Sequence, residues 1–367
     1  MNDAKTNYRI LFAGGGTGGH LFPAVAVAQQ IKEMKPEAEI LFVGTKSKIE
    51  GKVIPTLGYN FKSIWISGIK RKLSLENILF PLKLFVSSVQ SIVINMLFKP
   101  AVAIGSGGYV SGPALWSASL TGSKIILLEQ NSYPGLTTRL LEKYADEVHL
   151  SFEESKKYLR RKNILFITGN PVRKNLGSVS RNEALKKFDL TDSKKTLLVL
   201  GGSLGAYSIN KAVAGVIKRL EENWIQVIWQ TGKIYFDHHK QLKSANIKVF
   251  DFIEDMNAAY SASDLVLARA GATTIAELLV LGKPSILVPS PNVAEDHQYH
   301  NAKSLSDQSA SVLLEDKNLA ENLYQTTVST ISNDTKLNEL KNNALSLAKP
   351  DAAKIIAVNA IKYCERI

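Results

Sequence analysis

The sequence predicts an α/β protein made of two units, each with a parallel sheet covered by helices on both faces. Several short runs are continuously apolar, such as ILFA at 10–13 and AVAI at 101–104, as in strands that are buried on both sides. Helical patterns separate most of these runs. A strand–glycine–helix junction near the N-terminus recurs at 196–213. With 367 residues, 45% of them hydrophobic, the chain can bury two cores.

The elements follow in order along the chain. The strands expected in the first unit are 9–13, 39–45, 61–66, 101–106, 124–130, 147–152 and 163–168. GNPVRKNL at 169–176 breaks this rhythm, and a polar link with a short helix follows. The second unit is expected to begin with a strand at 196 and to continue with strands at 225–231, 247–253, 265–269, 284–290 and 310–315. We therefore expect an N-terminal domain at 1–172, a C-terminal domain at 173–348, and a terminal helix at 349–367 that packs back on the first domain.

Composition narrows the class of partner. The formal net charge of +12 favours anionic partners such as phosphorylated substrates or anionic lipid. Nucleic acid is not expected, because the chain has no recognisable nucleic-acid-binding motif. The single cysteine, Cys364, suits a reducing compartment. No secretory signal is expected, no Cys/His spacing suggests zinc, and there is no D-x-D triplet, so neither a metal site nor a cofactor is predicted.

One segment raises the question of a membrane. Residues 78–98 approach transmembrane length but contain Pro81, Lys83, Gln90 and Asn95. A true span stays open as an alternative. The expectation is a helix partly buried in the domain, with its early turns on a bilayer surface.

Glycine-rich turns follow three of the expected strands, at 14–20 (GGGTGGH), 105–113 and 201–206. Glycine lets a phosphate approach the backbone, and the first turn of a helix offers unpaired N–H groups. The first turn contains G-x-G-x-x-G, but the strand at 39–45 ends in Gly-Thr rather than in the acid that a dinucleotide site needs. We therefore predict phosphate sites in both domains, facing a shared cleft, and keep a dinucleotide oxidoreductase or a non-catalytic nucleotide binder as alternatives.

Polar residues at these junctions suggest chemistry. His20 closes the first glycine turn, where a helix N-terminus disfavours the imidazolium, so a neutral imidazole could accept a proton. The alternative is a structural histidine. Thr273 and Thr274 lie at a predicted helix start, suited to phosphate. Glu277 lies one turn further on and could accept both hydroxyls of a ribose, or could be a solvated helix residue.

Seven motifs in order, GGGTGGHLFPAVAVA, GSGGYVSGP, LLEQN, GNPVR, GGSLGA, RAGATTIAE and DHQYHNA, closely resemble the MurG family. These bacterial glycosyltransferases of family 28 convert lipid I to lipid II in peptidoglycan synthesis. The resemblance runs from about residue 8 to about 302. It implies the GT-B architecture, with two Rossmann-like domains facing a deep cleft. It also implies inverting, metal-independent transfer of GlcNAc from UDP-GlcNAc, held by the C-terminal domain, to the C4 hydroxyl of lipid I, approached by the N-terminal domain.

The resemblance also implies roles for single residues. The donor-binding positions are Thr17, Gly18, Gly19, Asn131, Arg173, Ser203, Ile253, Ala272, Thr273, Thr274, Glu277 and Gln298. The presumed acceptor wall comprises Gly15, Gly16, Gly107, Gly108 and Tyr109. His20 is the expected general base, and Glu129 is the alternative. His297 stands where some relatives have a second glutamine.

A lipid-borne acceptor gives the apolar–basic stretch at 65–85 a purpose. The expected membrane residues are Trp65, Ile69, Lys70, Arg71, Lys72, Leu75, Leu79 and Phe80. The chain is therefore expected at the cytoplasmic face of the bacterial inner membrane as a peripheral protein. Anionic lipids are expected partners, as are proteins of cell-wall synthesis or division. The runner-up function is another GT-B enzyme, with a different lipid acceptor or with UDP-GlcNAc 2-epimerase activity.

Overall fold

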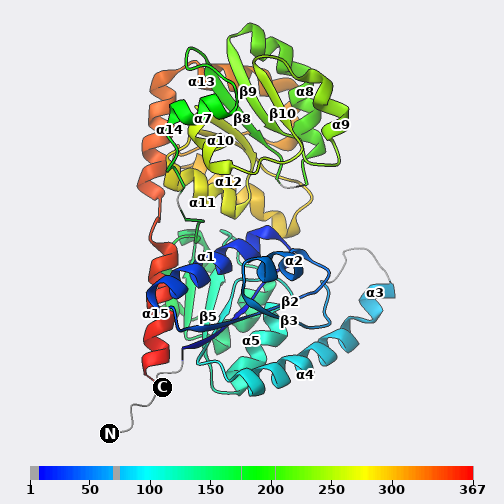
Figure 1. Ribbon diagram of the computed structural model, residues 1–367, viewed down its shortest axis with the longest axis vertical. Helices are drawn as coiled ribbons and strands as arrows, with labels where there is room; N and C mark the ends of the chain where they lie inside the picture. Colours follow the sequence, from blue (N-terminus) through cyan, green and yellow to red (C-terminus); the bar gives the residue numbers. More distant parts are fainter. Residues whose placement is uncertain (1–7, 69–74, 175, 203, 367) are drawn as a thin grey trace. The chain divides into compact units, whose positions relative to one another are not determined.

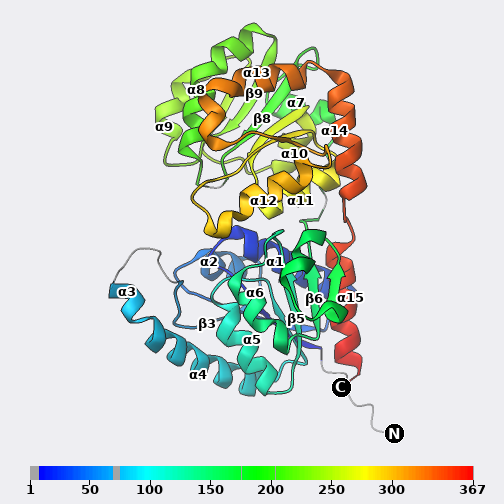
Figure 2. The ribbon, with the colours of Figure 1, turned by 180° about the vertical axis from the view of Figure 1, so that it is seen from behind.

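The computed structural model describes residues 8–68, 75–174, 176–202 and 204–366. The chain divides into two compact units, Met1–Arg173 with Lys349–Ile367, and Lys174–Ala348. Figure 1 shows the order of the elements from the N- to the C-terminus, and Figure 2 shows the same ribbon from behind. Each unit holds a parallel sheet with helices on both faces, which confirms the predicted fold class.

The sheet of the first unit has the strand order β3-β2-β1-β4-β5-β6-β7. Its strands are β1 (Arg9–Ala13), β2 (Glu39–Gly44), β3 (Asn60–Ser63), β4 (Val102–Gly105), β5 (Lys124–Glu129), β6 (Glu147–Leu150) and β7 (Leu165–Ile167). Its helices are α1 (Gly18–Met34), α2 (Ile49–Thr56), α3 (Leu75–Ile78), α4 (Phe80–Phe98), α5 (Ser111–Leu120), α6 (Leu136–Leu141) and α15 (Ala352–Glu365), with 3-10 turns at Glu142–Tyr144, Glu153–Tyr158 and Lys162–Ile164.

Strand β1 shows how the sequence makes this layering. Successive side chains of a strand point to opposite faces of the sheet. Ile10 and Phe12 enter the core that α1 and α15 cover. Leu11 and Ala13 enter the core on the other face, with α5. A strand that is buried on both faces has no polar side, which explains its continuous apolar run.

The sheet of the second unit has the order β10-β9-β8-β11-β12-β13. Its strands are β8 (Lys195–Leu200), β9 (Ile225–Gln230), β10 (Ile247–Phe250), β11 (Leu265–Arg269), β12 (Ser285–Val288) and β13 (Val312–Leu313). Its helices are α7 (Arg181–Lys187), α8 (Tyr207–Glu222), α9 (Phe236–His239), α10 (Met256–Ala262), α11 (Ala272–Leu281), α12 (His297–Ser306), α13 (Leu319–Ile331) and α14 (Asp334–Leu347), with 3-10 turns at Lys240–Leu242, Ala294–Asp296 and Asp316–Asn318.

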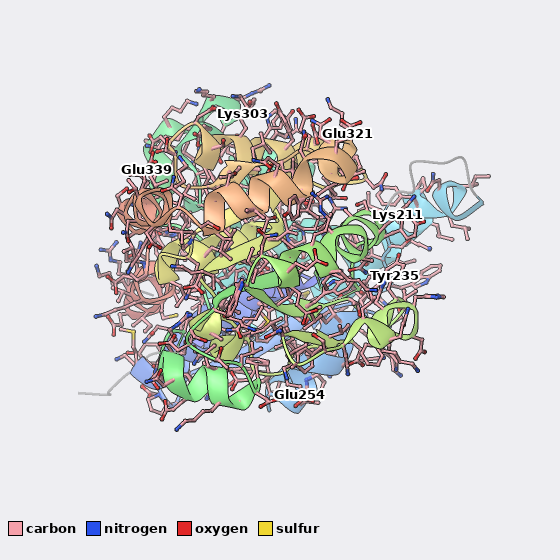
Figure 3. The ribbon with its side chains drawn as sticks, turned by 90° about the horizontal axis from the view of Figure 1, so that it is seen from above. Lys211, Tyr235, Glu254, Lys303, Glu321 and Glu339 are labelled. Atoms are coloured by element: carbon pink, nitrogen blue, oxygen red, sulfur yellow. The ribbon has the colours of Figure 1, made fainter. Side chains whose placement is uncertain are left out.

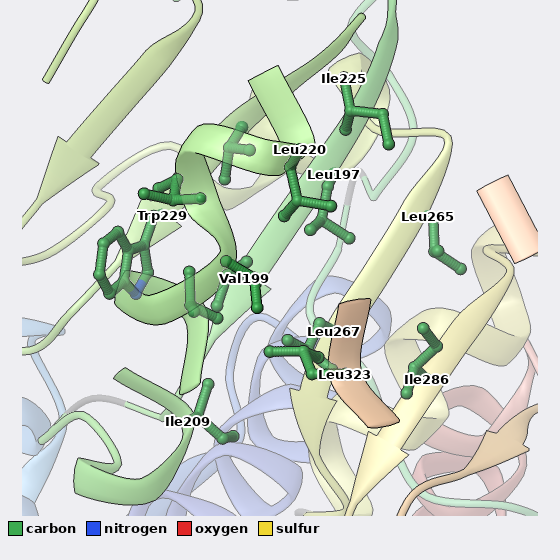
Figure 4. Close-up of a cluster of buried hydrophobic side chains, with 14 of the residues drawn as sticks. Leu197, Val199, Ile209, Leu220, Ile225, Trp229, Leu265, Leu267, Ile286 and Leu323 are labelled. Atoms are coloured by element: carbon green, nitrogen blue, oxygen red, sulfur yellow. The ribbon is translucent and has the colours of Figure 1, made fainter. Parts of the chain in front are cut away.

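Helix α8 packs on this sheet by a regular apolar stripe. Ile209, Val213, Val216 and Leu220 recur at helical spacing and are buried, since residues three and four apart share one helix face. Figure 4 shows Ile209 and Leu220 of this helix with strand residues of the same core, such as Leu197 and Trp229. The opposite sides of the helices are polar: Figure 3 shows the exposed Lys211, Lys303, Glu321 and Glu339 on α8, α12, α13 and α14, together with Tyr235 and Glu254.

Several strands are shorter than the sequence predicts. The strand expected at 61–66 is Asn60–Ser63, the one at 247–253 is Ile247–Phe250, and the one at 310–315 is Val312–Leu313. In each case the apolar run continues beyond the last residue of the strand. The loops that follow these strands still bury apolar side chains, namely Ile64, Ile66, Ile253 and Leu314. The apolar pattern therefore extends further along the chain than the strand itself.

Helix α4 packs on the domain through polar side chains and exposes its apolar ones, the reverse of a usual surface helix. Its buried residues are Ser87, Ser91 and Asn95, one turn apart, and they face α5, which lies beside α4 in both views (Figures 1 and 2). Asn95 Nδ2 donates to Ser117 Oγ at 2.7 Å and to Ala114 O at 3.2 Å. The apolar side chains of the helix point outward, with Phe85 67% and Leu97 79% exposed. The helix is partly buried, as expected, but its exposed apolar face continues beyond the early turns to Leu97, because polar side chains make the contact with α5.

The C-terminal helix α15 belongs to the first unit. Ile356, Ala357, Ala360 and Cys364 join the core that α1 covers. Glu147 of β6 fixes the helix from the side, because its carboxylate accepts from Asn359 Nδ2 at 2.9 Å and from Tyr363 OH at 3.1 Å. Burial raises the pKa of the Cys364 thiol to about 12.

Candidate active site

The two sheets place their glycine turns at equivalent positions. In an open parallel sheet, ligands bind beyond the carboxyl ends of the strands, where the strand order reverses. In the first unit this point lies between β1 and β4, and in the second between β8 and β11. The turns at 14–17, 106–110 and 201–206, and the start of α11, all follow these four strands. Each unit thus has its own half-site.

Glu50, which sequence analysis missed, holds the first glycine turn. Its side chain is buried, and its Oε2 accepts the backbone N–H of Gly16 at 2.9 Å. Its Oε1 accepts from Thr45 N at 3.0 Å and from Thr45 Oγ1 at 2.6 Å. The carboxylate therefore joins the end of β2 to the turn after β1. The N–H groups left to meet an anion are those of Thr17, Gly18 and Gly19, at the start of α1.

His20 lies in the first turn of α1 with its orientation fixed through Nδ1. This atom is 2.9 Å from Ser106 O and 3.1 Å from Gln130 Oε1. Both oxygens only accept, so Nδ1 carries the proton and Nε2 of the neutral ring keeps its lone pair. Gly107 makes this close approach possible, because a Cβ there would lie 2.8 Å from Nδ1, and its φ of +96° also favours glycine.

The other residues assigned to this half-site are held by their own loops. Glu129 is buried, and it accepts from Asn131 N and Gly135 N, each at 3.0 Å, and from Asn131 Nδ2 at 3.3 Å. This carboxylate orders the turn after β5, which weakens the case for it as a base. The ring of Tyr109 lies against Gly16. Burial raises the pKa of Tyr109, while a hydrogen bond to Thr45 lowers it and the nearby Glu50 raises it further.

In the second unit the turn after β8 packs on the turn after β9. Gly205 has a φ of +79°, and a Cβ there would lie 1.9 Å from Thr231 O, so no side chain fits. Gln230 joins the two neighbouring loops, because its Nε2 donates to Gly202 O at 3.1 Å and its Oε1 accepts from Ile253 N at 2.8 Å. The backbone N–H of Ile253 is therefore used within the protein.

The start of α11 has the features of an anion site. Its N-cap is Gly271, and no side chain caps the helix. The hydroxyl of Thr273 is buried without a hydrogen-bond partner, and Ala272 and Thr274 lie beside it. Unpaired N–H groups and the positive end of the helix dipole attract a phosphate. Asn301 Nδ2 donates to Ala270 O at 3.3 Å, just before the helix.

Glu277 is buried, which excludes the solvated alternative. Its Oε2 accepts from Tyr260 OH at 2.9 Å, so a buried tyrosine orients the carboxylate. Gln298 lies at the start of α12, where its Oε1 accepts from Ser290 N at 2.9 Å and its Nε2 points the other way. Arg269, missed by sequence analysis, ties β11 to its neighbours by donating to Pro289 O at 3.0 Å and Ser208 Oγ at 2.7 Å.

Some predicted residues lie outside these two groups. Arg173 is exposed at the end of the first unit. Trp65 and Leu79 are exposed, Phe80 is half-buried, and Leu75 begins α3. Ile69, Lys70, Arg71, Lys72 and Ser203 lie outside the described residues. Among the residues that the structure describes, no group of three or more His, Cys, Asp or Glu side chains could hold a metal ion.

Comparisons with known proteins cover both units of the chain. Residues 10–150 match the glycosyltransferase family 28 N-terminal domain, and residues 196–356 match the family 28 C-terminal domain. The protein named UDP-N-acetylglucosamine--N-acetylmuramyl-(pentapeptide) pyrophosphoryl-undecaprenol N-acetylglucosamine transferase from Cytophaga hutchinsonii is 45% identical, over 95% of each chain. The protein of the same name from Bacteroides thetaiotaomicron is 44% identical over 97% of this chain and 98% of its own.

Solved structures extend the comparison. MurG from Acinetobacter baumannii is similar with a TM-score of 0.77 and 28% identity, over 96% of this chain and 99% of its own. A UDP-GlcNAc 2-epimerase from Neisseria meningitidis has a TM-score of 0.68 at 14% identity, over 96% of this chain and 99% of its own, which shows a shared fold alone. The two family 28 domains and the full-length relatives lead to one conclusion: the chain belongs to glycosyltransferase family 28 and, within it, to the MurG family of N-acetylglucosamine transferases.

Proposed function

We propose that this chain transfers GlcNAc from UDP-GlcNAc to the C4 hydroxyl of the MurNAc-pentapeptide of lipid I, giving lipid II for peptidoglycan synthesis. The relatives named for this transfer match nearly its full length. The observation that carries the proposal is the start of α11, where an uncapped helix and the unpartnered Thr273 hydroxyl lie one turn before the buried Glu277. A phosphate bound at the start of α11 and a ribose bound by Glu277 are the two parts that a uridine diphosphate would place there.

The donor half of the reaction needs groups that accept growing negative charge. As the bond between the anomeric carbon and the UDP oxygen breaks, the electron pair leaves with UDP. The N–H groups of Ala272, Thr273 and Thr274 and the α11 dipole would stabilise this charge without proton transfer. Arg173 and the Ser203 turn are proposed to add to them. Gln298 Nε2 is available for a sugar hydroxyl, since Oε1 is used by Ser290.

The acceptor half needs a base. We assign this role to His20, whose Nε2 would take the proton of the C4 hydroxyl as its oxygen bonds to the anomeric carbon from the face opposite UDP. The bond from Nδ1 to Ser106 O supports this assignment, because it leaves the lone pair on the other nitrogen. Glu129 is the weaker choice, since its oxygens already accept three hydrogen bonds from Asn131 and Gly135. The N–H groups of Thr17, Gly18 and Gly19 would meet a diphosphate.

We propose that the chain is a peripheral protein of the cytoplasmic face of the inner membrane, and helix α4 supports the membrane contact. It is the one helix in the described part of the chain that is long and apolar enough to span a bilayer. It has 19 residues and a mean hydropathy of 1.4, and only 17% of its most apolar stretch is buried inside the protein. Its buried face is polar and already occupied by α5 through Asn95. We propose that its outer face, Leu82, Phe85, Val89, Val93 and Met96, lies on the acyl chains while the helix stays attached to α5.

Lysine and glutamine of α4 fit this interpretation better than a span. Lys83 Nζ donates to Ser67 Oγ at 2.9 Å, and Gln90 Oε1 accepts from Trp65 N at 2.7 Å. Both polar side chains therefore fasten the loop that carries Trp65 to the helix. The basic residues Lys70, Arg71 and Lys72 are proposed to meet anionic headgroups. Contacts with proteins of cell-wall synthesis or division stay a prediction.

A single assay tests the function against its rivals. The purified chain is given UDP-GlcNAc with a lipid I analogue in detergent or vesicles, and UDP release and the disaccharide product are measured. Transfer that depends on the analogue supports the proposal. Conversion of UDP-GlcNAc alone to its 2-epimer would replace it with the epimerase, and transfer only to a different lipid acceptor would change the substrate. If the chain binds NAD but does not bind UDP, it is not a UDP-sugar enzyme.

A further inference from the structure

Gln130 is the side chain that contacts the proposed base. Its Oε1 lies 3.1 Å from His20 Nδ1, although the two residues are 110 positions apart in the sequence. It follows directly after β5 and is buried. Among the hydrogen bonds of the described residues, no other side chain reaches the His20 ring; the second contact is the backbone oxygen of Ser106.

The amide of Gln130 has one orientation. Its Nε2 donates to Leu128 O at 3.1 Å, so Oε1 is the end that faces His20. The reverse orientation would bring an NH₂ group against the Nδ1–H and would leave Leu128 O facing an acceptor. Ser106 is equally fixed, because its N–H donates to Ala13 O at 3.0 Å, which ties the end of β4 to β1. Two strand ends therefore hold the imidazole from the Nδ1 side.

Charged groups nearby are engaged elsewhere. Three titratable side chains of the segments beside His20 are Glu50, Tyr109 and Glu129. Glu50 holds Gly16 and Thr45, Glu129 holds Asn131 and Gly135, and the Tyr109 hydroxyl bonds to Thr45. None of them forms a hydrogen bond with His20 among the described contacts. When Nε2 accepts a proton, the positive charge of the imidazolium is therefore met at Nδ1 by two neutral carbonyl oxygens.

We propose that Gln130 is a positioning residue that fixes the ring orientation and tautomer of His20 and stabilises the imidazolium formed during transfer. The inference rests on the proposed role of His20 as base. A hydrogen bond that gains charge assistance in the transition state strengthens there more than in the ground state. The amide of Gln130 adds no charge beside the ring, whereas a carboxylate at this position would favour the protonated form.

Two variants separate these effects. Gln130→Met keeps the length of the side chain but removes the acceptor, and we expect kcat to fall about tenfold or more with the KM for UDP-GlcNAc unchanged. Gln130→Glu keeps an acceptor, and we expect near-normal kcat at alkaline pH with the acid limb of the kcat profile moved up by about one pH unit. In a His20→Ala background, Gln130→Met should have no further effect on kcat, because the two residues act as a unit. Unchanged kcat and pH profiles in both variants, or full additivity with His20→Ala, would overturn the proposal.

A spectroscopic test does not depend on turnover. In the full-length protein labelled with ¹⁵N-histidine, with the His20 signal identified by its loss in His20→Gln, we expect the Nδ1–H tautomer in the wild type. We expect mixed tautomers or a broadened signal in Gln130→Met and a higher titration midpoint in Gln130→Glu. An unaltered His20 spectrum in both would refute the positioning role even if transfer is normal. If His20→Ala transfers at the wild-type rate, the base assignment fails separately.

A matched control guards against a general loss of stability. Gln226 is also a buried glutamine, bonded to Thr191 and Thr196 in the second unit. Gln226→Met should lower the thermal midpoint without moving the pH profile. Should Gln130→Met fail to fold, Gln130→Glu in the kinetic and spectroscopic assays still decides the outcome.

Discussion

The side-chain carboxyl of Glu50 accepts the backbone N–H of Gly16 at 2.9 Å, so a buried acidic residue lies against the glycine turn that is proposed to meet a diphosphate. This contact sets the shape of the turn and takes one of its N–H groups out of use. The remaining groups, at Thr17, Gly18 and Gly19, are at the start of α1. Under the proposed function the turn would meet an anion through the helix start, while Glu50 holds the residue just before it in place.

Replacing this carboxylate should loosen the turn without affecting the second unit. In Glu50→Gln an NH₂ group must face the N–H of either Gly16 or Thr45, which costs about 1–3 kcal/mol for an unpaired buried donor. We expect a lower thermal midpoint and a higher KM for the lipid I analogue, with the affinity for UDP-GlcNAc unchanged. Calorimetry and titration with UDP-GlcNAc measure these quantities. A loss of UDP-GlcNAc affinity equal to the change in KM would show that the effect is not local.

Glu277 should govern affinity for the donor. Glu277→Ala is expected to raise the Kd for UDP-GlcNAc about tenfold to a hundredfold, which corresponds to about 1.4–2.8 kcal/mol. Tyr260→Phe is the companion variant, because it removes the hydroxyl that orients the carboxylate at 2.9 Å but keeps the carboxylate itself. We expect Tyr260→Phe to have a smaller effect in the same direction. Equal affinity for UDP-GlcNAc in the wild type and Glu277→Ala, by isothermal calorimetry, would remove the ribose role.

The outer face of α4 should bind lipid independently of salt. Phe85→Gln, Val89→Gln and Val93→Gln together replace three exposed apolar side chains by a good helix former. We expect at least about tenfold weaker binding to vesicles of phosphatidylethanolamine and phosphatidylglycerol, since each partly buried side chain contributes about 1 kcal/mol. Neutralising Lys70, Arg71 and Lys72 should instead weaken binding mainly at low salt.

Transfer to a short-chain, water-soluble lipid I analogue should survive the triple change. Ile355→Gln, which removes an exposed apolar side chain from α15, is the matched control and should bind vesicles like the wild type. Undiminished flotation of the triple variant with vesicles would exclude α4 as the membrane face.

Docking of α15 should depend on pH at both extremes. For Glu147, burial raises the pKa, but hydrogen bonds from His149, Asn359 and Tyr363 outweigh it and lower the pKa below its ordinary value of 4.5. This stabilisation is present above that value and is lost as the pH falls through the lowered pKa. Burial, with Glu147 nearby, raises the pKa of Tyr363 from 10.0 to about 12. That stabilisation is complete below pH 10 and is lost as the pH rises toward 12.

Hydrogen exchange of the α15 amides measures this docking. We expect the protection factor, which is the intrinsic exchange rate divided by the observed rate at the same pH, to be largest between these limits and to fall at either end. Glu147→Gln should accelerate exchange at neutral pH and flatten its acid dependence. Unchanged protection in Glu147→Gln would contradict this prediction and would mean that apolar contacts, such as those of Ile356 and Ala360, are enough to hold the helix.

Local pattern predicted much of this molecule. Continuous apolar runs gave the strands, and glycine after a strand gave the turns at 14–17 and 201–206. The exposed residues of α4 were harder to predict from the sequence. Composition shows that a helix is apolar, but it does not show which side of the helix packs against the protein. A signal was present in the four-residue spacing of Ser87, Ser91 and Asn95, which marks a small polar stripe suited to close contact with another helix.

The supporting contacts could not be predicted from the sequence. Glu50 and Gly16 are 34 positions apart, and Gln130 and His20 are 110 apart. Each pair meets because two strands end at the same edge of a sheet, in an order that only the fold defines. Glu50 has the local pattern of an ordinary residue in the first turn of a helix, and Gln130 that of a residue after a strand. Neither pattern contains its partner.

The burial of Cys364 makes this protein a convenient one to label. With a thiol pKa of about 12, roughly one molecule in ten thousand carries the thiolate at pH 8. Maleimide reagents should therefore pass over the native cysteine and modify a cysteine introduced at a chosen surface position. A polarity-sensitive fluorophore at position 93 would then report, in the otherwise natural sequence, how deeply α4 enters a bilayer.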